Sequence, residues 1–481
     1  MGEAAIDVRN YINGRWVNGV TMGYRNNPSD TREVVAEYAR ADRTQAEEAA
    51  RAAADAFVLW QVSATQRRCD ALDQIGGELL ARKEELGRLL AREEGKTLPE
   101  AVAEVVRAGQ IFKFFAGEAL RIQGETMASE RPDVQVDVTP AAVGVFGVIA
   151  PWSSPFAVPA WTIAPALAYG NTVILKSAEL APACGAALAE IISRAQLPSG
   201  VFNFLVGSGR EVGQALVDSP LVDAISFAGS QGIGAQIQRA TAARGARAQL
   251  DMGGKNPLIV LADADQDAAV ECAIRGAFAS AGQRCTASSS VIVESAVHDA
   301  FVQKMARRMA ALKVGNAMGR GIDIGPVVDE SRLTQNQRFL DVARSEGAEH
   351  VCGGELIEAA SPGHYMRPAL WLARPQDRIA REEIFGPVAA VLEADDYEHA
   401  LALANNTPDG RCAGLCTRSL SRAMHFRRHA VVGMTVVNLP TVDVDFRVPV
   451  GGRKRSSPGP GERGRDASGF YTTVKTGYMK V

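Results

Sequence analysis

The 481-residue sequence lacks the features that mark several large classes of protein. It has no uninterrupted apolar run near the roughly 20 residues that a membrane-spanning helix needs, and its first residues lack the basic and apolar regions of a signal peptide. Its formal net charge is only −3, and no basic run is long enough to suggest a nucleic-acid surface. We therefore expect a cytoplasmic protein without a membrane or nucleic-acid partner.

Cysteine and histidine are also sparse, and neither is grouped. The seven cysteines are scattered and odd in number, which argues against a disulfide framework in so long a chain. Cys412 and Cys416 lie four residues apart, but no second pair or histidine cluster accompanies them, so buried thiols are favoured over a metal site. The six histidines show no ligand spacing such as H-E-x-x-H. We expect no metal.

What the sequence does have is a regular alternation of apolar runs and amphipathic segments. Residues 43–121 are Ala-rich and charged, with apolar residues at three- and four-residue steps, and predict helices. From Val143 onward, short apolar runs alternate with helical patterns and glycines at the joints, and a second such series begins at Asn256. This alternation is typical of parallel sheets covered by helices, so two tandem α/β domains with a cleft between them are expected.

Two further segments predict strands outside these sheets. In 134–139 three valines alternate with polar residues, and 470–481 is rich in Thr and Tyr. Such additions often build subunit contacts, although a simple edge hairpin fits the pattern equally well.

A glycine-bearing turn at 227–234, Phe-Ala-Gly-Ser-Gln-Gly-Ile-Gly, follows an apolar strand and opens a helix. Free backbone N–H groups and a positive dipole end would lie there, where a pyrophosphate could bind. The spacing is not G-x-G-x-x-G, and a purely structural turn explains it equally well. Lys176 and Glu179, at the end of another strand, could hold ribose hydroxyls, or could form an ordinary surface ion pair.

Cys285 stands between a basic residue and a hydroxyl residue, in the run Gly282-Gln283-Arg284-Cys285-Thr286. A nearby guanidinium and backbone N–H groups favour the thiolate that a nucleophilic cysteine needs. Taken by itself, a cysteine is more often a small buried hydrophobe.

The chain as a whole resembles the aldehyde dehydrogenase superfamily from Tyr11-Ile12-Asn13-Gly14 to its C-terminus. The matching stretches, in order, are 151–152, 163–167, 170–173, 227–234, 253–257, 282–285 and 383–387. Within the superfamily, 252–257, the Gln-Arg-Cys-Thr-Ala run, 438–441, 451–454 and 470–476 look most like the α-ketoglutarate semialdehyde (2,5-dioxovalerate) dehydrogenases.

The resemblance implies a doubly wound, Rossmann-like cofactor domain, a catalytic domain and a small β oligomerisation element. The corresponding ranges are 1–125 with 141–250, then 251–450, and finally 126–140 with 451–481. It further implies a homodimer or homotetramer.

The resemblance implies a reaction that begins with attack of Cys285 on a small-molecule aldehyde, passes through a thiohemiacetal and a thioester, and ends in the carboxylic acid. The cofactor groove is expected to comprise Ile149, Pro151, Trp152, Lys176, Glu179, Gly209, Phe227, Gly229, Ser230, Ile233, Met252, Glu383 and Phe385. Glu179 favours NAD, because a carboxylate near the 2′ position repels the phosphate of NADP, but NADP stays open. Arg284 could receive a substrate carboxylate, or could tune the thiol or pair with a neighbouring acid.

Two catalytic positions depart from the family pattern. Ser153 stands where the family usually has an asparagine that donates to the oxyanion, and losing one such donor typically costs about 10²–10³ in rate. Asp251 stands where the family has the glutamate that acts as general base, and it retracts the carboxylate by roughly 1.5 Å, one C–C bond. Ser177 and Ser290 are smaller departures, and Ser290 weakens the transfer of a keto-acid substrate from the most similar group.

These departures leave three hypotheses. The first is oxidation of a small polar or acidic aldehyde, with Ser153 and Asp251 reshaping the pocket. The second is transfer of the acyl group from Cys285 to an acceptor other than water, because the step that removes the acyl group is the one most altered. The third is a catalytically silent homologue that serves as a binding protein, although such a protein would have no use for Cys285, Lys176 and Glu383 together.

Overall fold

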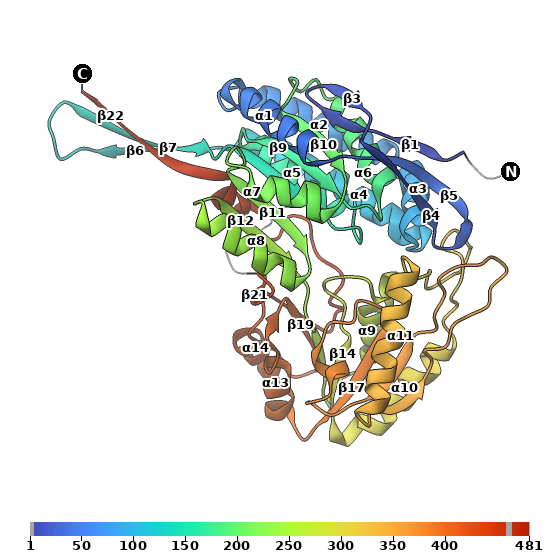
Figure 1. Cartoon of the computed structure of the whole chain (residues 1–481). Helices are drawn as coiled ribbons and strands as arrows, with labels where there is room; N and C mark the ends of the chain where they lie inside the picture. The colour runs from blue at the N-terminus through green and yellow to red at the C-terminus, as the bar shows by residue number, and fades with distance from the viewer. Residues whose placement is uncertain (1–3, 458–463, 481) are drawn as a thin grey trace.

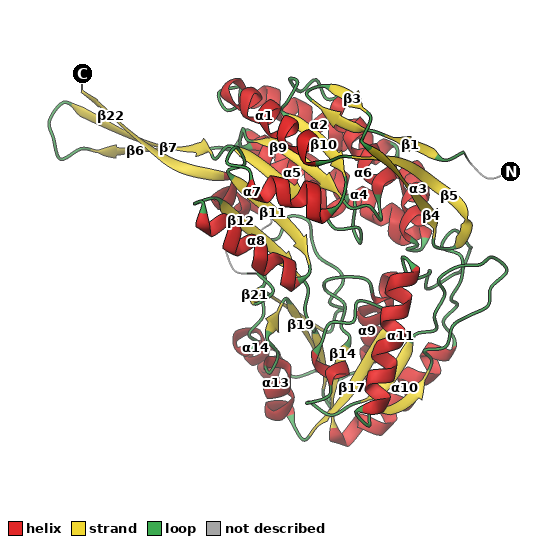
Figure 2. Ribbon diagram, in the orientation of Figure 1, coloured by secondary structure: helices red, strands yellow, loops and turns green. Residues whose placement is uncertain are grey.

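The computed structural model describes residues 4–457 and 464–480. Two α/β bodies lie one above the other, and a narrow ribbon of strands projects sideways from the upper one (Figure 1). Each body has a seven-stranded sheet with helices packed against it (Figure 2). The expected α/β architecture with two domains is confirmed.

The first domain is built around a sheet in the order β12-β11-β8-β9-β10-β2-β3. Its first five strands, from β12 to β10, are parallel, and β8, β9 and β10 are almost wholly buried, which explains their continuous apolar runs. The strands are β2 (Asn10–Ile12), β3 (Arg15–Val17), β8 (Val145–Ile149), β9 (Thr172–Ser177), β10 (Phe202–Val206), β11 (Ala224–Gly229) and β12 (Arg247–Met252).

Helices of the first domain begin in the segment expected to be helical. That segment holds α1 (Arg43–Trp60), α2 (Thr65–Ala81), α3 (Lys83–Glu94) and α4 (Leu98–Ala119), and the later helices are α5 (Ala157–Ala168), α6 (Pro182–Ser193), the π-helix η1 (Gly209–Gly213), α7 (Gln214–Asp218) and α8 (Gln231–Ala243). A small N-terminal sheet, which the sequence pattern did not indicate, has the order β1-β5-β4. Its strands are β1 (Ile6–Val8), β4 (Thr21–Asn27) and β5 (Asp30–Arg40).

The second domain repeats the plan with the order β15-β16-β17-β14-β13-β19-β20. Its strands are β13 (Pro257–Val260), β14 (Ser290–Glu294), β15 (Glu349–Cys352), β16 (Ala369–Leu372), β17 (Val388–Ala394), β19 (Cys412–Cys416) and β20 (Met434–Val437). Its helices are α9 (Gln266–Phe278), η2 (Ala279–Gly282), η3 (Ser295–Val297), α10 (His298–Ala310), α11 (Glu330–Ser345), α12 (Arg378–Arg381), α13 (Tyr397–Asn405) and α14 (Leu420–His429).

The segments expected outside the two main sheets form a third sheet. Strands β22 (Thr472–Lys480), β7 (Val134–Ala142) and β6 (Glu125–Ala128) pair antiparallel in that order. They make the ribbon that projects from the body in Figure 1. The C-terminal range assigned to this element also holds β21 (Arg453–Lys454), which pairs instead with β18 (Asp409–Gly410), followed by η4 (Gly464–Ala467) and α15 (Ser468–Tyr471). Residues 458–463 and 481 of that range lie outside the described residues.

The chain passes from one domain to the other after β12. Asp251 and Met252 are still in the first sheet, where they pair with Ala228 and Gly229 of β11, and the second sheet begins at Pro257. In the part of the chain that the structure describes, none of the helices has the length and apolar character needed to span a bilayer.

Candidate active site

A cavity of about 1530 Å³ is lined by residues of both domains. It brings together residues that lie far apart in the sequence, such as Ile149 and Phe385, which are 236 positions apart (385 − 149). The lining includes the sequence-predicted residues Ile149, Pro151, Trp152, Ser153, Lys176, Gly209, Phe227, Gly229, Ser230, Ile233, Asp251, Arg284, Cys285, Glu383 and Phe385. Of the residues predicted to form the site, Glu179 and Met252 are not in the lining.

Cys285 lies on a loop between α9 and β14 whose backbone is strained. Ser280 and Ala281 have φ of 51° and 55°, a left-handed conformation that residues other than glycine rarely adopt, and Gly282 follows with φ 68°. A Cβ at Gly282 would lie 2.2 Å from the carbonyl oxygen of Gly386, so only glycine fits there. The loop thus holds a half-buried thiol at the cavity wall.

Hydrogen bonds from outside the loop fix this conformation. Asn256 donates from Nδ2 to the carbonyl oxygens of Cys285 (2.9 Å) and Ala287 (3.0 Å). Gln283 accepts the N–H of Val328 at 2.9 Å. Strained backbone persists only where its surroundings over-determine it, and these contacts supply that constraint.

Arg284, the expected substrate cation, already contacts an acid of the protein. Its Nη2 lies 3.6 Å from Oε1 of Glu100, and its Nε donates to Oγ of Ser280 at 3.0 Å. The side chain is 27% exposed and lines the cavity, so a substrate carboxylate would share the guanidinium with Glu100.

Asp251 is engaged by an arginine that the sequence analysis missed. Its Oδ1 lies 2.6 Å from Nη1 of Arg411, and its Oδ2 accepts from Nη2 at 2.8 Å. Arg411 is only 1% exposed, just before strand β19. The signal in the sequence is a charged residue directly before the apolar run 412–416. A charge next to a buried strand is tolerated only when a counter-charge pairs with it.

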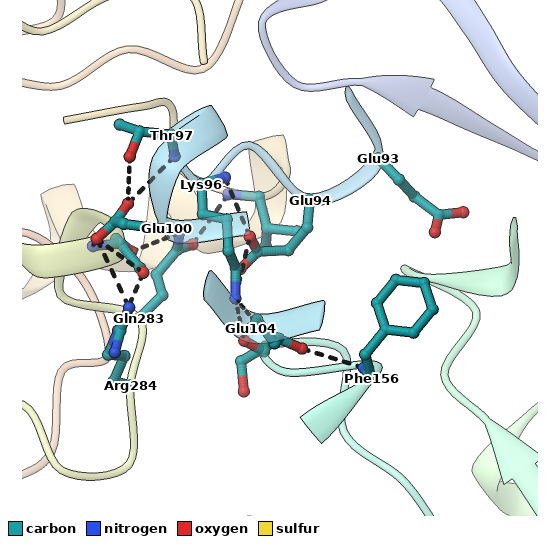
Figure 3. A network of polar contacts seen from close by, with 12 residues as sticks. Glu93, Glu94, Lys96, Thr97, Glu100, Glu104, Phe156, Gln283 and Arg284 are labelled. Atoms are coloured by element: carbon teal, nitrogen blue, oxygen red, sulfur yellow. Dashed lines mark hydrogen bonds and ion pairs between the residues drawn. The ribbon is translucent and has the colours of Figure 1, made fainter. Parts of the chain in front are cut away.

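Ser153 lies in the turn between β8 and α5. Its carbonyl oxygen accepts a hydrogen bond from Lys96 Nζ at 2.9 Å, and Lys96 also donates to Glu104 Oε2 at 2.5 Å (Figure 3). Lys96 and Glu104 were likewise missed. Their spacing of eight within a charged helical segment looks like an ordinary solvated face, yet both are buried.

The expected cofactor residues lie along the first domain's half of the cavity. Ser230 is the N-cap of α8, and Gly209 begins η1 with open space around its Cα. Burial lowers the pKa of Lys176 to about 8, with Glu179 opposing the shift. The N-terminus of α8 suits an anion such as a pyrophosphate, and Lys176 adds a buried amine to the lining of the same cavity.

Glu179 and Met252 have other contacts. Arg40 donates to Glu179 Oε1 at 2.9 Å, and the hydroxyl of Tyr38 lies 3.4 Å from the same oxygen. Met252 packs beneath α8, where a Cβ at Gly234 would meet its Sδ at 2.2 Å. Glu179 is therefore tied to strand β5, and Met252 supports the helix rather than the cavity wall.

Glu383 closes the opposite side of the cavity. Burial raises its pKa to about 7, the charge of Asp409 adds to the rise, and Lys255 opposes it. A Cβ at Gly253 would lie 2.0 Å from Oε1 of Glu383, so glycine is required for the carboxylate to lie there. Phe385 makes an edge contact with Trp152 of the first domain, with ring centroids 5.5 Å apart.

No group of three or more His, Cys, Asp or Glu side chains among residues 4–457 and 464–480 is arranged to hold a metal ion.

Residues 16–477 match the model of the aldehyde dehydrogenase family. The chain belongs to this family and is an aldehyde dehydrogenase, as the resemblance of the sequence predicts. It is 38% identical to the α-ketoglutaric semialdehyde dehydrogenase of Bacillus subtilis, with 98% of each chain covered, and 38% identical to the α-ketoglutarate semialdehyde dehydrogenase of Haloferax volcanii with the same coverage. The fold is similar to the crystal structure of betaine aldehyde dehydrogenase from Staphylococcus aureus in complex with NAD+, with a TM-score of 0.96, 29% identity, and 99% and 95% of the two chains covered.

Proposed function

We propose that this protein oxidises a small polar or acidic aldehyde to its carboxylic acid, with Cys285 as the nucleophile and NAD as the hydride acceptor. The observation that carries the proposal is one cavity that holds both Cys285 and the residues expected to bind a dinucleotide. The semialdehyde dehydrogenase relatives support the substrate class.

The residues present fit NAD. The N-terminus of α8 at Ser230 and the open space at Gly209 suit the pyrophosphate, and Lys176 and Glu383 suit ribose hydroxyls. Glu179 retains a carboxylate near this side but shares it with Arg40, so the same region also offers a cation to the phosphate of NADP. When bound, the nicotinamide supplies an acceptor for hydride.

Attack forms a C–S bond between the Cys285 thiolate and the aldehyde carbon, and the carbonyl oxygen becomes an oxyanion. Ser153 is assigned to donate a hydrogen bond to that oxygen, which develops charge only as the bond forms. Loss of hydride from the same carbon leaves a thioester on Cys285. Attack by water then breaks the C–S bond and releases the acid, while the proton of water passes to a base.

Arg284 supports an acidic substrate. It is the cavity-lining cation next to the nucleophile, and its planar guanidinium suits a carboxylate. Because Glu100 lies 3.6 Å away, a carboxylate on the substrate would displace or share that contact.

The pairing of Asp251 with Arg411 favours a second candidate function, transfer of the acyl group to a thiol or an amine. Taking a proton from water would weaken the charge-assisted hydrogen bond and the ion-pair contact that hold the Asp251 carboxylate. A nucleophile that needs less help from a base would then compete with water for the thioester.

Purified protein mixed with NAD and a panel of semialdehydes tests the proposal. We expect reduced nicotinamide, followed by its absorbance, and the matching acid as product, with neither formed by Cys285→Ser. Cofactor binding without any turnover across the panel would refute oxidation and leave a binding protein. Acyl transfer predicts that an added thiol raises the steady rate and yields its thioester in place of the acid.

Assembly and location are part of the same proposal. The sheet β22-β7-β6 projects from the body and exposes Met127, Val474 and Tyr478, which supports a role as the subunit contact of a homodimer or homotetramer. We place the protein in the cytoplasm.

A further inference from the structure

Helix α4 carries two carboxylates that hold two different loops of the candidate active site. Glu100 and Glu104 are four residues apart, so they lie on one face of the helix, and both line the cavity. Figure 3 shows them pointing from this helix toward separate partners, Glu100 toward the loop of Arg284 and Glu104 toward Phe156.

Glu104 holds the C-terminal end of the turn that contains Ser153. Its Oε1 accepts the backbone N–H groups of Phe156 (3.0 Å) and Ala157 (3.3 Å) at the start of α5. The N-cap residue of this helix, Phe156, has no side chain that could accept these hydrogen bonds. Glu104 therefore takes the place of an N-cap from a neighbouring helix and fixes where α5 begins.

Lys96 holds the near end of the same turn. Its Nζ donates to the carbonyl oxygen of Ser153 at 2.9 Å and to Oε2 of Glu104 at 2.5 Å. One buried ion pair thus binds both ends of the turn, at the carbonyl of Ser153 and at the N–H groups of Phe156 and Ala157.

The pair is rigid because both members are buried, Lys96 at 3% and Glu104 at 8% exposure. Burial opposes the positive charge, but the carboxylates of Glu104 and Glu94 outweigh it and raise the pKa of Lys96. Breaking the pair would leave an uncompensated charge in a medium of low dielectric, which is costly.

Glu100 holds the other loop. Its Oε1 accepts the backbone N–H of Ser280 at 2.8 Å and the hydroxyl of Ser280 at 3.2 Å, at the first left-handed residue of the segment that leads to Cys285. The loop that carries Cys285 and the turn that carries Ser153 are therefore both held by carboxylates of helix α4.

We propose that Lys96 and Glu104 are positioning residues that hold Ser153 in register with Cys285 for oxyanion stabilisation, with Glu100 anchoring the loop of Cys285 on the same helix. This inference rests on the proposed function, in which Ser153 donates to the oxyanion. It assigns a role to a buried ion pair through its hydrogen bonds to the turn of Ser153.

The test is a double-mutant cycle of Glu104→Gln with Ser153→Ala, read by the rate of the single-turnover burst of reduced nicotinamide. Gln keeps a carbonyl oxygen for the N–H groups of α5 but loses the charge that holds Lys96. We expect Glu104→Gln to slow the burst by about 10- to 100-fold in the natural chain and by less than about 3-fold when Ser153 is already alanine. The double variant Lys96→Met with Glu104→Gln, which removes both charges of the pair, should slow the burst to the same extent.

Alkylation of Cys285 by iodoacetamide separates positioning from general damage, because this reaction forms no oxyanion. We expect its rate to be unchanged in Glu104→Gln. Glu118→Gln is the matched control, since Glu118 is a buried acid on the same helix that pairs with Arg121 and is not in the cavity lining, and its burst should equal that of the natural chain. Equal losses from Glu104→Gln with and without Ser153, or a parallel loss of alkylation, would overturn the proposal.

Acylation of Cys285 by 4-nitrophenyl acetate extends the test, because this ester also gives a tetrahedral oxyanion and needs no cofactor. If aldehydes gave no burst but the ester showed the expected cycle, the aldehyde substrate would be wrong and the positioning role right. If neither the aldehydes nor the ester acylated Cys285 while iodoacetamide still alkylated it, both the proposed function and the positioning role would be wrong.

Discussion

Asp251 and Arg411 form a two-point ion pair within the fold, with oxygen–nitrogen distances of 2.6 and 2.8 Å. Asp251 occupies the position where the resemblance to the family places the general base, and it still lines the cavity with Cys285. The carboxylate is therefore a partner of a buried cation as well as a candidate base. This pairing gives a physical reason why removal of the acyl group is the step on which the two candidate functions differ.

Replacing Asp251 with alanine should destabilise the protein by about 3–5 kcal/mol, because it leaves the Arg411 guanidinium buried without its counter-charge. The free energy of unfolding in urea measures this. Asp251→Ala combined with Arg411→Leu should recover most of the loss, since no buried charge remains. If Asp251→Ala were as stable as the natural chain, the ion pair would contribute nothing to the free energy of unfolding.

Replacing Glu100 with alanine should slow alkylation of Cys285 by about 10-fold, the scale expected when a reacting group loses its placement. The loop at Ser280 and Ala281 would lose the acceptor that holds its left-handed backbone. Timed labelling with iodoacetamide gives the rate. Glu84→Ala, an acid in the first turn of the neighbouring helix α3 and outside the lining, is the control. A rate unchanged in Glu100→Ala would mean that Asn256 and Gln283 suffice.

Glu94 should make stability depend on pH. Burial raises its pKa from 4.5 to about 7, with the charge of Lys96 opposing the shift. The folded state therefore keeps a proton that the unfolded state has lost, and the contribution of Glu94 to the free energy of unfolding falls as pH rises from about 4.5 to about 7. Relative to the natural chain, Glu94→Gln should become more stable across this range, as urea unfolding at several pH values would reveal. A difference that stayed constant with pH would contradict the shift.

Affinity for NAD should rise with pH up to about 7 if Glu383 binds ribose hydroxyls. Burial raises the pKa of Glu383 to about 7, and only its ionised form accepts two hydrogen bonds. Below that pH the affinity should fall by up to about tenfold per unit, as measured by titration calorimetry. Glu383→Gln should bind more weakly and lose the dependence, whereas Glu382→Gln, a half-exposed neighbour paired with Arg378, should keep it. The same slope in Glu383→Gln would assign the effect to another group.

The sequence predicted most of the fold because the apolar runs of a parallel sheet are long and continuous. Strands β8, β9 and β10 lie in the segment where the sequence predicts short apolar runs, and their side chains are apolar along the whole strand because both faces of each are covered. The N-terminal sheet was missed because strands such as β4 alternate between buried and exposed residues and carry Gly, Tyr, Arg and Asn in place of a plain apolar pattern.

The sequence likewise predicted which residues meet in the cavity, but not how their charges are paired. Arg411 pairs with Asp251, 160 positions away in the chain. Lys96 and Glu104 pair with each other, and they also bind backbone groups of the Ser153 turn that are 57 and 52 positions away. Periodicity reports burial along one element and carries no information about such pairs. Glu179, a residue expected at the cofactor, also pairs with Arg40 of an N-terminal strand that the pattern did not indicate.

In the proposed reaction, Cys285 carries the acyl group after hydride has left the aldehyde. The most direct measurement is intact-protein mass spectrometry, with peptide mapping, of protein quenched within one turnover after mixing with a semialdehyde and NAD. We expect one equivalent of reduced nicotinamide and a mass gain equal to the aldehyde less two hydrogen atoms, located on Cys285 and absent from Cys285→Ser. Oxidation of the aldehyde by Cys285→Ser at the rate of the natural chain, or reduced nicotinamide formed with the adduct on another residue, would contradict it.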